Sequence, residues 1–378
     1  AYFDDSYRGI LKHESMFFSR FLSEAQKKGV VSYVPNHLRN SGCDRSWYMD
    51  RIGGPVGVYV VSARPMDKHG YFCTSTVGMS NRALVGQART VVLEINENLP
   101  RTFGDSFIHI SETDCVYYGN NEVKYLQPSA PDDIDLKIGE YIAELVEDGS
   151  TIQLGIGGIP NAAAKALSGK KDLGVHTEML SDSFLSLYEQ GVITNRKKTS
   201  FEDRMVTTFS FGSKALYDFI DDNPGILHLD VSKVNSPYEI AKNHKMVSVN
   251  TTLQIDLTGQ CASEARGMLQ ISGTGGQTDT AMGAKMSQGG KSIIALRSTA
   301  DIKNGQGVPQ RISKVVSAHD KGTVISLLRA DADFIVTEYG IAELRGRSLK
   351  ERAGALIGIA HPDFRDKLLA DAEELYLL

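Results

Sequence analysis

The chain has 378 residues, 41% hydrophobic and 23% charged, and its 41 Lys plus Arg against 46 Asp plus Glu give a net charge of −5. This balance excludes extensive disorder, and the lack of a basic stripe argues against binding to nucleic acid. No apolar run reaches the ~18 residues of a membrane span, so we expect no membrane partner. The length is typical of about two domains.

The four cysteines form no CxxC pair, and the nine histidines show no HxxxH or HExxH spacing. These patterns predict neither a disulfide framework nor a metal site, and they suit a reducing compartment. The first residues carry no secretory signal, so we expect a cytoplasmic protein. A mitochondrial matrix protein whose presequence has been removed would look the same.

Short apolar runs rich in β-branched residues alternate with helical patterns. Runs that are hydrophobic on both faces predict strands of largely parallel sheets in an α/β fold. The predicted strands are Val56–Val61, Thr90–Asn96, Thr151–Ile156, Leu173–Thr177, Met205–Phe211, Met246–Asn250, Lys291–Leu296, Thr323–Leu327 and Phe334–Thr337. The predicted helices are Leu136–Leu145, Ala162–Leu167, Ser183–Glu189, Lys214–Ile220 and, after a capping box at Ser348 and Glu351, a helix to about Ala360, with another opened by His361-Pro362.

A linker is predicted over residues 126–133, where two prolines and several polar residues interrupt the pattern. This divides the chain into a first domain over residues 1–127 and a second over residues 128–378.

A glycine-rich loop, Gly155-Ile156-Gly157-Gly158-Ile159, follows one predicted strand, and we expect Pro160 to be the first residue of the next helix. Backbone N–H groups at such a helix start can bind a phosphate or stabilise an oxyanion. Two other interpretations stay open. The loop could be a structural turn, or part of a GxGxxG dinucleotide motif with Glu178 as its acid, although Pro160 occupies the third glycine position.

Two glutamates follow predicted strands, at the edge where open α/β sheets bind ligands. Glu178 could act as a nucleophile or a base, or it could cap the next helix or pair with a surface cation. Glu338 could form a structural ion pair with Arg345. A second glycine loop, residues 272–279, opens another helical pattern.

Together these segments resemble the acetyl-CoA hydrolase/transferase family, which includes 4-hydroxybutyrate CoA-transferase and butyryl-CoA:acetate CoA-transferase. The resemblance covers essentially the whole chain. The motifs that carry it are GIGGIPNA (155–162), LGVHTEMLSD (173–182), SVN (248–250), IDLTGQ (255–260), SGTGGQTD (272–279), GGKSIIAL (289–296), VTEYGIAELRG (336–346) and ERAGALIGIAHPDFR (351–365). It implies two related open α/β domains with largely parallel sheets and an active site at their interface, as in class I CoA-transferases.

The resemblance also implies the site. Glu178 would attack the acyl-CoA carbonyl, with supporting roles for Asn250, Gln277 and Glu338. No metal and no tightly bound cofactor is implied; coenzyme A or its acyl form is the substrate, and the protein is expected to be a homodimer or higher homo-oligomer. The implied CoA-binding and oxyanion residues are Gly155, Ile156, Gly157, Gly158, Ile159, Leu253 and Gly276.

The implied activity is transfer of CoA between a short-chain acyl-CoA (acetyl-, butyryl- or 4-hydroxybutyryl-CoA) and a carboxylic acid such as acetate, through a glutamyl-CoA thioester with ping-pong kinetics. The alternatives are an acyl-CoA hydrolase with the same site, a non-catalytic CoA binder and an NAD-dependent dehydrogenase. The chain departs from the family in two ways. It starts inside the N-terminal domain, so we expect the first strand–helix units to be absent. Gln254 stands where relatives often carry an acid, so we expect no catalytic role for it.

Overall fold

The computed structural model describes residues 9–52, 54, 56–119, 121–126, 130–303 and 307–378. A six-stranded sheet forms its centre, with strands β9 (Thr151–Leu154), β10 (Gly174–Val175), β15 (Met246–Thr251), β20 (Lys291–Ala295), β24 (Phe334–Thr337) and β25 (Gly340–Glu343). The strand order is β10-β9-β15-β20-β24-β25. All neighbours pair in parallel except β25, which is antiparallel to β24.

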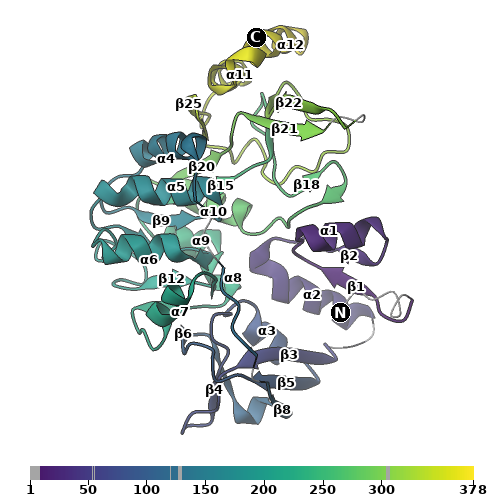
Figure 1. Ribbon diagram of the computed structural model, residues 1–378, viewed down its shortest axis with the longest axis vertical. Helices are drawn as coiled ribbons and strands as arrows, with labels where there is room; N and C mark the ends of the chain where they lie inside the picture. The colour runs from purple at the N-terminus through teal and green to yellow at the C-terminus, as the bar shows by residue number, and fades with distance from the viewer. Residues whose placement is uncertain (1–8, 53, 55, 120, 127–129, 304–306) are drawn as a thin grey trace.

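Helices cover both faces of this sheet, which explains why its strands are hydrophobic on both sides. The helices in contact with it are α4 (Asp133–Leu145), α5 (Gly158–Ala166), α10 (Gln277–Met286) and α11 (Leu349–Ile359). In β20, Ile293 belongs to the same buried cluster as Ile138 of α4. The next residue, Ile294, belongs to a second cluster with Ala281 of α10 and Leu356 of α11. Figure 1 shows α4 and α5 stacked side by side over one face.

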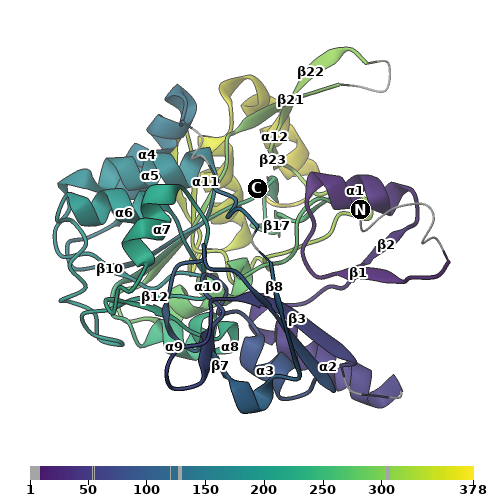
Figure 2. The ribbon, with the colours of Figure 1, turned by 60° about the horizontal axis from the view of Figure 1, so that its bottom comes forward.

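Further elements of this half surround the sheet. The hairpin of β21 and β22 projects from the body of the molecule (Figure 2). The helices are η4 (Leu167–Gly169), α6 (Asp182–Glu189), α7 (Lys214–Ile220), α8 (Val231–Val234), α9 (Pro237–Ala241) and α12 (Pro362–Glu374). The strands are β11 (Met179–Leu180), β12 (Met205–Thr207), β13 (Phe209–Ser210), β14 (Ile226–His228), β16 (Gln254–Asp256), β17 (Cys261–Ala262), β18 (Ala265–Arg266), β19 (Leu269–Gln270), β21 (Thr299–Lys303), β22 (Pro309–Ser313) and β23 (Val315–Val316).

The N-terminal part lies at the opposite end of the molecule from α11 and α12 (Figure 1). It contains a parallel sheet of β3 (Val58–Ala63), β5 (Thr90–Ile95) and β8 (Cys115–Tyr118), with its own small core. Its other elements are β1 (His13–Ser15), α1 (Arg20–Lys27), β2 (Val31–Tyr33), η2 (Leu38–Asn40), α2 (Ser41–Ile52), β4 (Tyr71–Cys73), α3 (Asn81–Val85), β6 (Phe103–Gly104), β7 (Phe107–His109) and η3 (Ile110–Glu112).

The two parts are joined by strand pairing, because β6 runs parallel to β14. Of the predicted linker, residues 127–129 lie outside the described residues. Its last part opens α4, where the Asp132 side chain accepts a hydrogen bond from the N–H of Asp135.

Most predicted elements form where expected, but three details differ. The predicted strand Thr323–Leu327 is wrong: residues 323–325 have no regular structure, and the segment pairs at one position only, an antiparallel bridge between Leu327 and Cys261. Met205–Phe211 divides into β12 and β13, which pair with different strands. Pro160 is the third residue of α5, not the first, a position whose N–H also lacks a partner within the helix.

The N-terminal part also holds the second glycine loop in place. The N–H of Leu38 donates to the Gly275 carbonyl at 3.1 Å, and the N–H of Thr274 donates to the Tyr33 hydroxyl at 3.0 Å. The Arg39 guanidinium forms an ion pair with Asp279, which is fully buried in the first turn of α10. A buried carboxylate needs such a partner, so this contact ties the start of α10 to the N-terminal part.

Replacing Arg39 by Met leaves the buried Asp279 charge without its cation, and we expect the free energy of unfolding to fall by about 3 kcal/mol. The double variant Arg39→Met/Asp279→Asn removes both charges and is expected to regain most of that loss. Urea unfolding followed by circular dichroism measures both. An Arg39→Met variant as stable as the parent chain would contradict this assignment.

Candidate active site

Glu178 lies at a bend between β10 and β11, and its backbone is held on one side by three donors. Its carbonyl accepts hydrogen bonds from the N–H groups of Thr208 and Phe209, at 3.0 and 3.2 Å, and from the Thr207 hydroxyl at 3.0 Å. Glu178 thus follows β10, as predicted. The segment 207–209 fixes the position of its backbone, from which the side chain extends.

The Glu178 carboxylate is half-buried and faces α8 and α10. Its Oε2 accepts a hydrogen bond of 2.6 Å from Nδ2 of Asn235, a fully buried residue directly after α8. A Cβ added to Gly276 would overlap both this carboxylate and the Asn235 amide, so only glycine fits there. Burial raises the pKa of Glu178, and the hydrogen bond from Asn235 opposes that rise. The alternative in which Glu178 caps the next helix or pairs with a surface cation is not formed, because the carboxylate bonds to the Asn235 amide.

The first glycine loop forms the start of α5, where the first N–H groups have no partner within the helix. Gly157 has a φ of 115°, which favours glycine. A Cβ on Gly158 would overlap the carboxylate of Asp135, which pairs with Arg297 at 2.8 Å. The Ile156 side chain is exposed. The loop therefore presents backbone donors at the carboxyl end of β9, with an acid–arginine pair behind it.

Asn250 and Gln277 connect this loop to α10. The Asn250 amide donates to the Thr280 hydroxyl at 2.9 Å, and its Oδ1 lies 4.0 Å from where a Cβ on Gly155 would be. The Gln277 amide donates to the Thr251 carbonyl at 2.9 Å. Two buried amide oxygens, Oε1 of Gln277 and Oδ1 of Asn235, find no donor within the described part of the chain. Such oxygens suit a ligand that carries N–H groups.

The other predicted site residues bond to their own neighbours. The Leu253 N–H donates to the Ala262 carbonyl at 3.1 Å. Oε1 of Gln254 lies 3.1 Å from Nδ1 of His319. Glu338, at the end of β24, accepts hydrogen bonds from the N–H and hydroxyl of Ser298, at 2.9 and 2.6 Å.

The possible ion pair between Glu338 and Arg345 is not formed. Arg345 instead donates to the Lys285 carbonyl at 3.1 Å. Although both residues follow β24 closely in sequence, β25 turns back antiparallel, so their side chains go to different neighbours.

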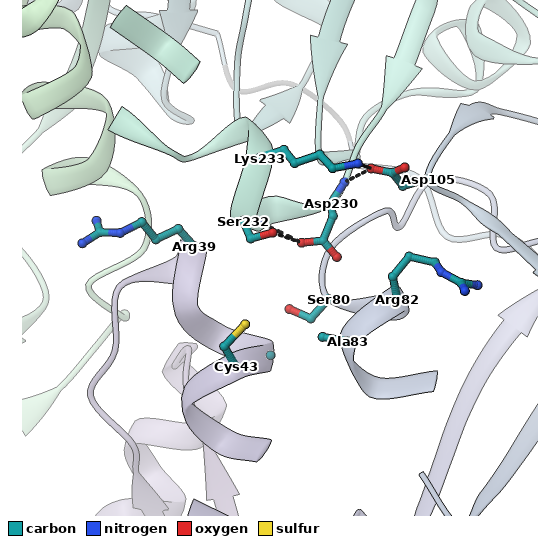
Figure 3. A pocket seen from close by; sticks show the side chains of 10 residues that line it. Arg39, Cys43, Ser80, Arg82, Ala83, Asp105, Asp230, Ser232 and Lys233 are labelled. Carbon is teal, nitrogen blue, oxygen red and sulfur yellow. Dashed lines mark hydrogen bonds and ion pairs between the residues drawn. The ribbon is translucent and has the colours of Figure 1, made fainter. Parts of the chain in front are cut away.

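A pocket of 210 Å³ lies beside α8, between the N-terminal part of the chain and the part that contains the six-stranded sheet. Figure 3 shows it lined by charged side chains from both parts. Lys233 pairs with Asp105 at 2.9 Å, and Arg82 pairs with Glu112 at 2.7 Å. Neither Glu178 nor a glycine loop lines this pocket. Lys233 and Arg82 of this pocket are thus already matched by carboxylates of the chain.

Asn235 is the residue that the sequence motifs did not single out. It lies in a short polar stretch, Asn235-Ser236, between Val234 and Pro237, without a pattern of its own, and only the fold brings it to Glu178. Within the described residues, no three His, Cys, Asp or Glu side chains gather as a metal site would require. No helix among them is long and apolar enough to cross a membrane.

Comparison with known proteins places the chain. Residues 1–126 match the acetyl-CoA hydrolase/transferase N-terminal domain, and residues 212–372 match the C-terminal domain of the same family. The 4-hydroxybutyrate coenzyme A transferase of Clostridium kluyveri is 44% identical over 368 residues, 97% of this chain and 82% of that protein. The chain belongs to the acetyl-CoA hydrolase/transferase family.

Two further similarities agree with this assignment. The succinyl-CoA:cyclohexane-1-carboxylate CoA transferase of Geobacter metallireducens is 42% identical over 375 residues, 99% of this chain and 83% of that protein. The crystal structure of RipA from Yersinia pestis superposes with a TM-score of 0.86 at 35% identity, covering 97% of this chain and 82% of that one. The predicted family, the α/β fold with largely parallel sheets and the prediction of a CoA-transferase enzyme are confirmed.

Because a Cβ on Gly276 would overlap Glu178 and Asn235, we expect Gly276→Ala to displace the carboxylate and to cost about 1–3 kcal/mol of stability. Gly169→Ala is the matched control, because a Cβ there meets nothing within 4 Å. Thermal unfolding of the two variants checks this. Equal melting temperatures would show that the contact at Gly276 is looser than described.

Proposed function

We propose that this protein transfers CoA between a short-chain acyl-CoA and a carboxylic acid, with Glu178 as the nucleophile. The observation that carries the proposal is the half-buried Glu178 carboxylate, held at 2.6 Å by the Asn235 amide and packed against the bare backbone of Gly276. Acetyl-, butyryl- or 4-hydroxybutyryl-CoA with acetate as acceptor are the proposed substrates.

The reaction consists of two exchanges at one carboxylate. The Glu178 carboxylate attacks the thioester carbonyl, the C–S bond breaks, and a mixed acyl–glutamyl anhydride forms with release of CoA thiolate. The thiolate then attacks the glutamyl carbonyl, which forms a glutamyl-CoA thioester and releases the first acid as its carboxylate. The second carboxylate attacks this thioester, and the same steps run in reverse. The energy of the thioester is retained, and no net proton is transferred.

The groups around Glu178 suit this chemistry because each attack places negative charge on a carbonyl oxygen. When the glutamyl carbonyl is attacked, the charge develops on an oxygen of Glu178 itself, within reach of the Asn235 donor. When the acyl carbonyl is attacked, N–H groups at residues 155–159 or at Gly276 are the proposed donors. These donors are held in place before the reaction starts, so little reorganisation is needed.

Coenzyme A is proposed to lie along residues 155–159, Leu253 and Gly276, with Asn250, Gln277 and Glu338 in support. The amide oxygen of Gln277, which has no donor within the described residues, supports this placement, because the pantetheine arm carries amide N–H groups that could bond to it. Binding energy from this arm, remote from the reacting carbon, can lower the barrier.

The proposed domains are residues 1–127 and 128–378, with the site at their interface in a cytoplasmic homo-oligomer. The contacts of Tyr33, Leu38 and Arg39 with the loop that carries Gly276 support an interface location.

The central test is mass spectrometry of the intact protein and its peptides after acetyl-CoA or butyryl-CoA is added without an acceptor acid. We expect an adduct on Glu178 with the mass of CoA less one water, as a glutamyl-CoA thioester requires, and we expect acetate to discharge it. Glu178→Gln should give none, whereas Glu189→Gln, an exposed residue at the end of α6, should behave as the parent chain. Release of CoA from unmodified protein would indicate a hydrolase, and an adduct on another residue would disprove the role of Glu178.

The pH dependence of adduct formation tests the role of Asn235. Only the carboxylate of Glu178 is nucleophilic, so the rate should fall as pH drops through its pKa, which burial raises above the ordinary value. Asn235→Ala removes the hydrogen bond that favours the carboxylate, so the pKa rises further. We expect the acidic limb to move about one pH unit upwards. An unchanged limb in stopped-flow measurements would show that the amide does not act on the carboxylate.

A further inference from the structure

His176 lies two residues before Glu178, and its ring is buried behind the site, 2% exposed. Nε2 of His176 lies 2.8 Å from the carbonyl oxygen of Val234. Val234 directly precedes Asn235, whose amide donates to Glu178. The segment 176–178 and the end of α8 are therefore joined by two hydrogen bonds in neighbouring positions, and one of them is the bond to the reactive carboxylate.

The His176 ring can only donate a hydrogen bond to the Val234 carbonyl; it cannot accept one there. Burial, with a smaller effect of the Lys198 charge, lowers the pKa of His176 to about 3, so the imidazole is neutral at ordinary pH. A neutral imidazole has a single N–H, and the Val234 carbonyl can only accept. The proton therefore sits on Nε2, and Nδ1 accepts the long contact of 3.4 Å from the Asn243 amide. The one N–H of His176 is thus directed at the Val234 carbonyl, and the ring acts as a fixed donor.

Helix α8 depends on such a donor. It has only four residues, Val231–Val234, and the carbonyl groups at its C-terminal end have no partner within the helix. At its N-terminal end the Asp230 side chain caps the helix by accepting from the Ser232 N–H at 2.9 Å. At the other end the N–H of Asn235 donates to the Val231 carbonyl, while His176 takes the Val234 carbonyl.

We propose that His176 is a positioning residue: by holding the Val234 carbonyl, it sets the distance between the Asn235 amide and the Glu178 carboxylate. The proposal rests on the proposed role of Glu178 as the nucleophile. In this proposal His176 does not contact the substrate. It affects the reaction only by positioning the Asn235 amide.

Two variants with an amide side chain distinguish the hydrogen bond that His176 donates from the space that its ring fills. The amide nitrogen of Gln lies near the position of Nε2 in a histidine ring, whereas that of Asn lies near Nδ1. His176→Gln can therefore still donate to Val234, and His176→Asn cannot. Both variants replace the ring by an amide. A difference in rate between them therefore shows whether a donor at the position of Nε2 is required.

His228 provides the matched control. It is also fully buried, burial also lowers its pKa to about 3, and its Nε2 lies 2.7 Å from the Ser210 hydroxyl, not from α8. His228→Asn therefore measures the loss of a buried histidine hydrogen bond that does not reach the Val234 carbonyl.

The experiment is a single-turnover measurement of CoA-adduct formation on the full chain, with the CoA dissociation constant and the pH profile of the rate. We expect His176→Asn to form the adduct about tenfold more slowly, to bind CoA within about twofold of the parent chain and to show an acidic limb at higher pH. His176→Gln should retain most of the rate, and His228→Asn should keep both rate and pH profile per folded molecule.

Three results would overturn the proposal: a parental rate in His176→Asn, an equally slow His176→Gln that is folded, or an equal loss in His228→Asn. If His176→Asn does not fold, the rate and the acidic limb of His176→Gln decide alone, and a slow rate or shifted limb counts against the proposal. A parent chain that forms no adduct would instead disprove the proposed function itself.

Discussion

One hydrogen bond, between the Asn235 amide and the Glu178 carboxylate, sets the conditions for everything else at this site. Burial alone would favour the protonated acid, which cannot attack a thioester, and a fully solvated carboxylate would lose the fixed donor. The amide favours the charged form while the surroundings keep the carboxylate half-buried. For the proposed nucleophile, it therefore balances two opposing demands on one side chain, which has to be ionised and yet not stabilised as strongly as in water.

The rest of the fold can be understood as the means of keeping that pair in place. Parallel strands end at one edge of the sheet, where the starts of α5 and α10 present backbone N–H groups without helical partners. Gly276 lets the backbone approach the carboxylate, and the N-terminal part holds the loop that carries it through Arg39 and Asp279. Segments that are far apart in the sequence thus meet around Glu178. The geometry there depends on contacts between the N-terminal part and the rest of the chain.

The sequence predicted what depends on local pattern: the doubly covered strands, the capped helix at Ser348, a carboxylate and a glycine loop at strand ends, and a second glycine loop that opens a helix. It did not predict Asn235, because a single amide in a short polar stretch carries no periodicity and reaches Glu178 only through the tertiary fold. The same limit explains the errors. Thr323–Leu327 has the composition of a strand but pairs only through one bridge, between Leu327 and Cys261, and Glu338 bonds to Ser298 in place of Arg345.

The most direct test is a crystal structure of the protein after reaction with butyryl-CoA in the absence of an acceptor acid. The account predicts continuous density from the Glu178 side chain to the sulfur of CoA, with the Asn235 amide still within hydrogen-bonding distance of the glutamyl carbonyl oxygen. CoA bound with its sulfur remote from Glu178, or joined to any other residue, would contradict it.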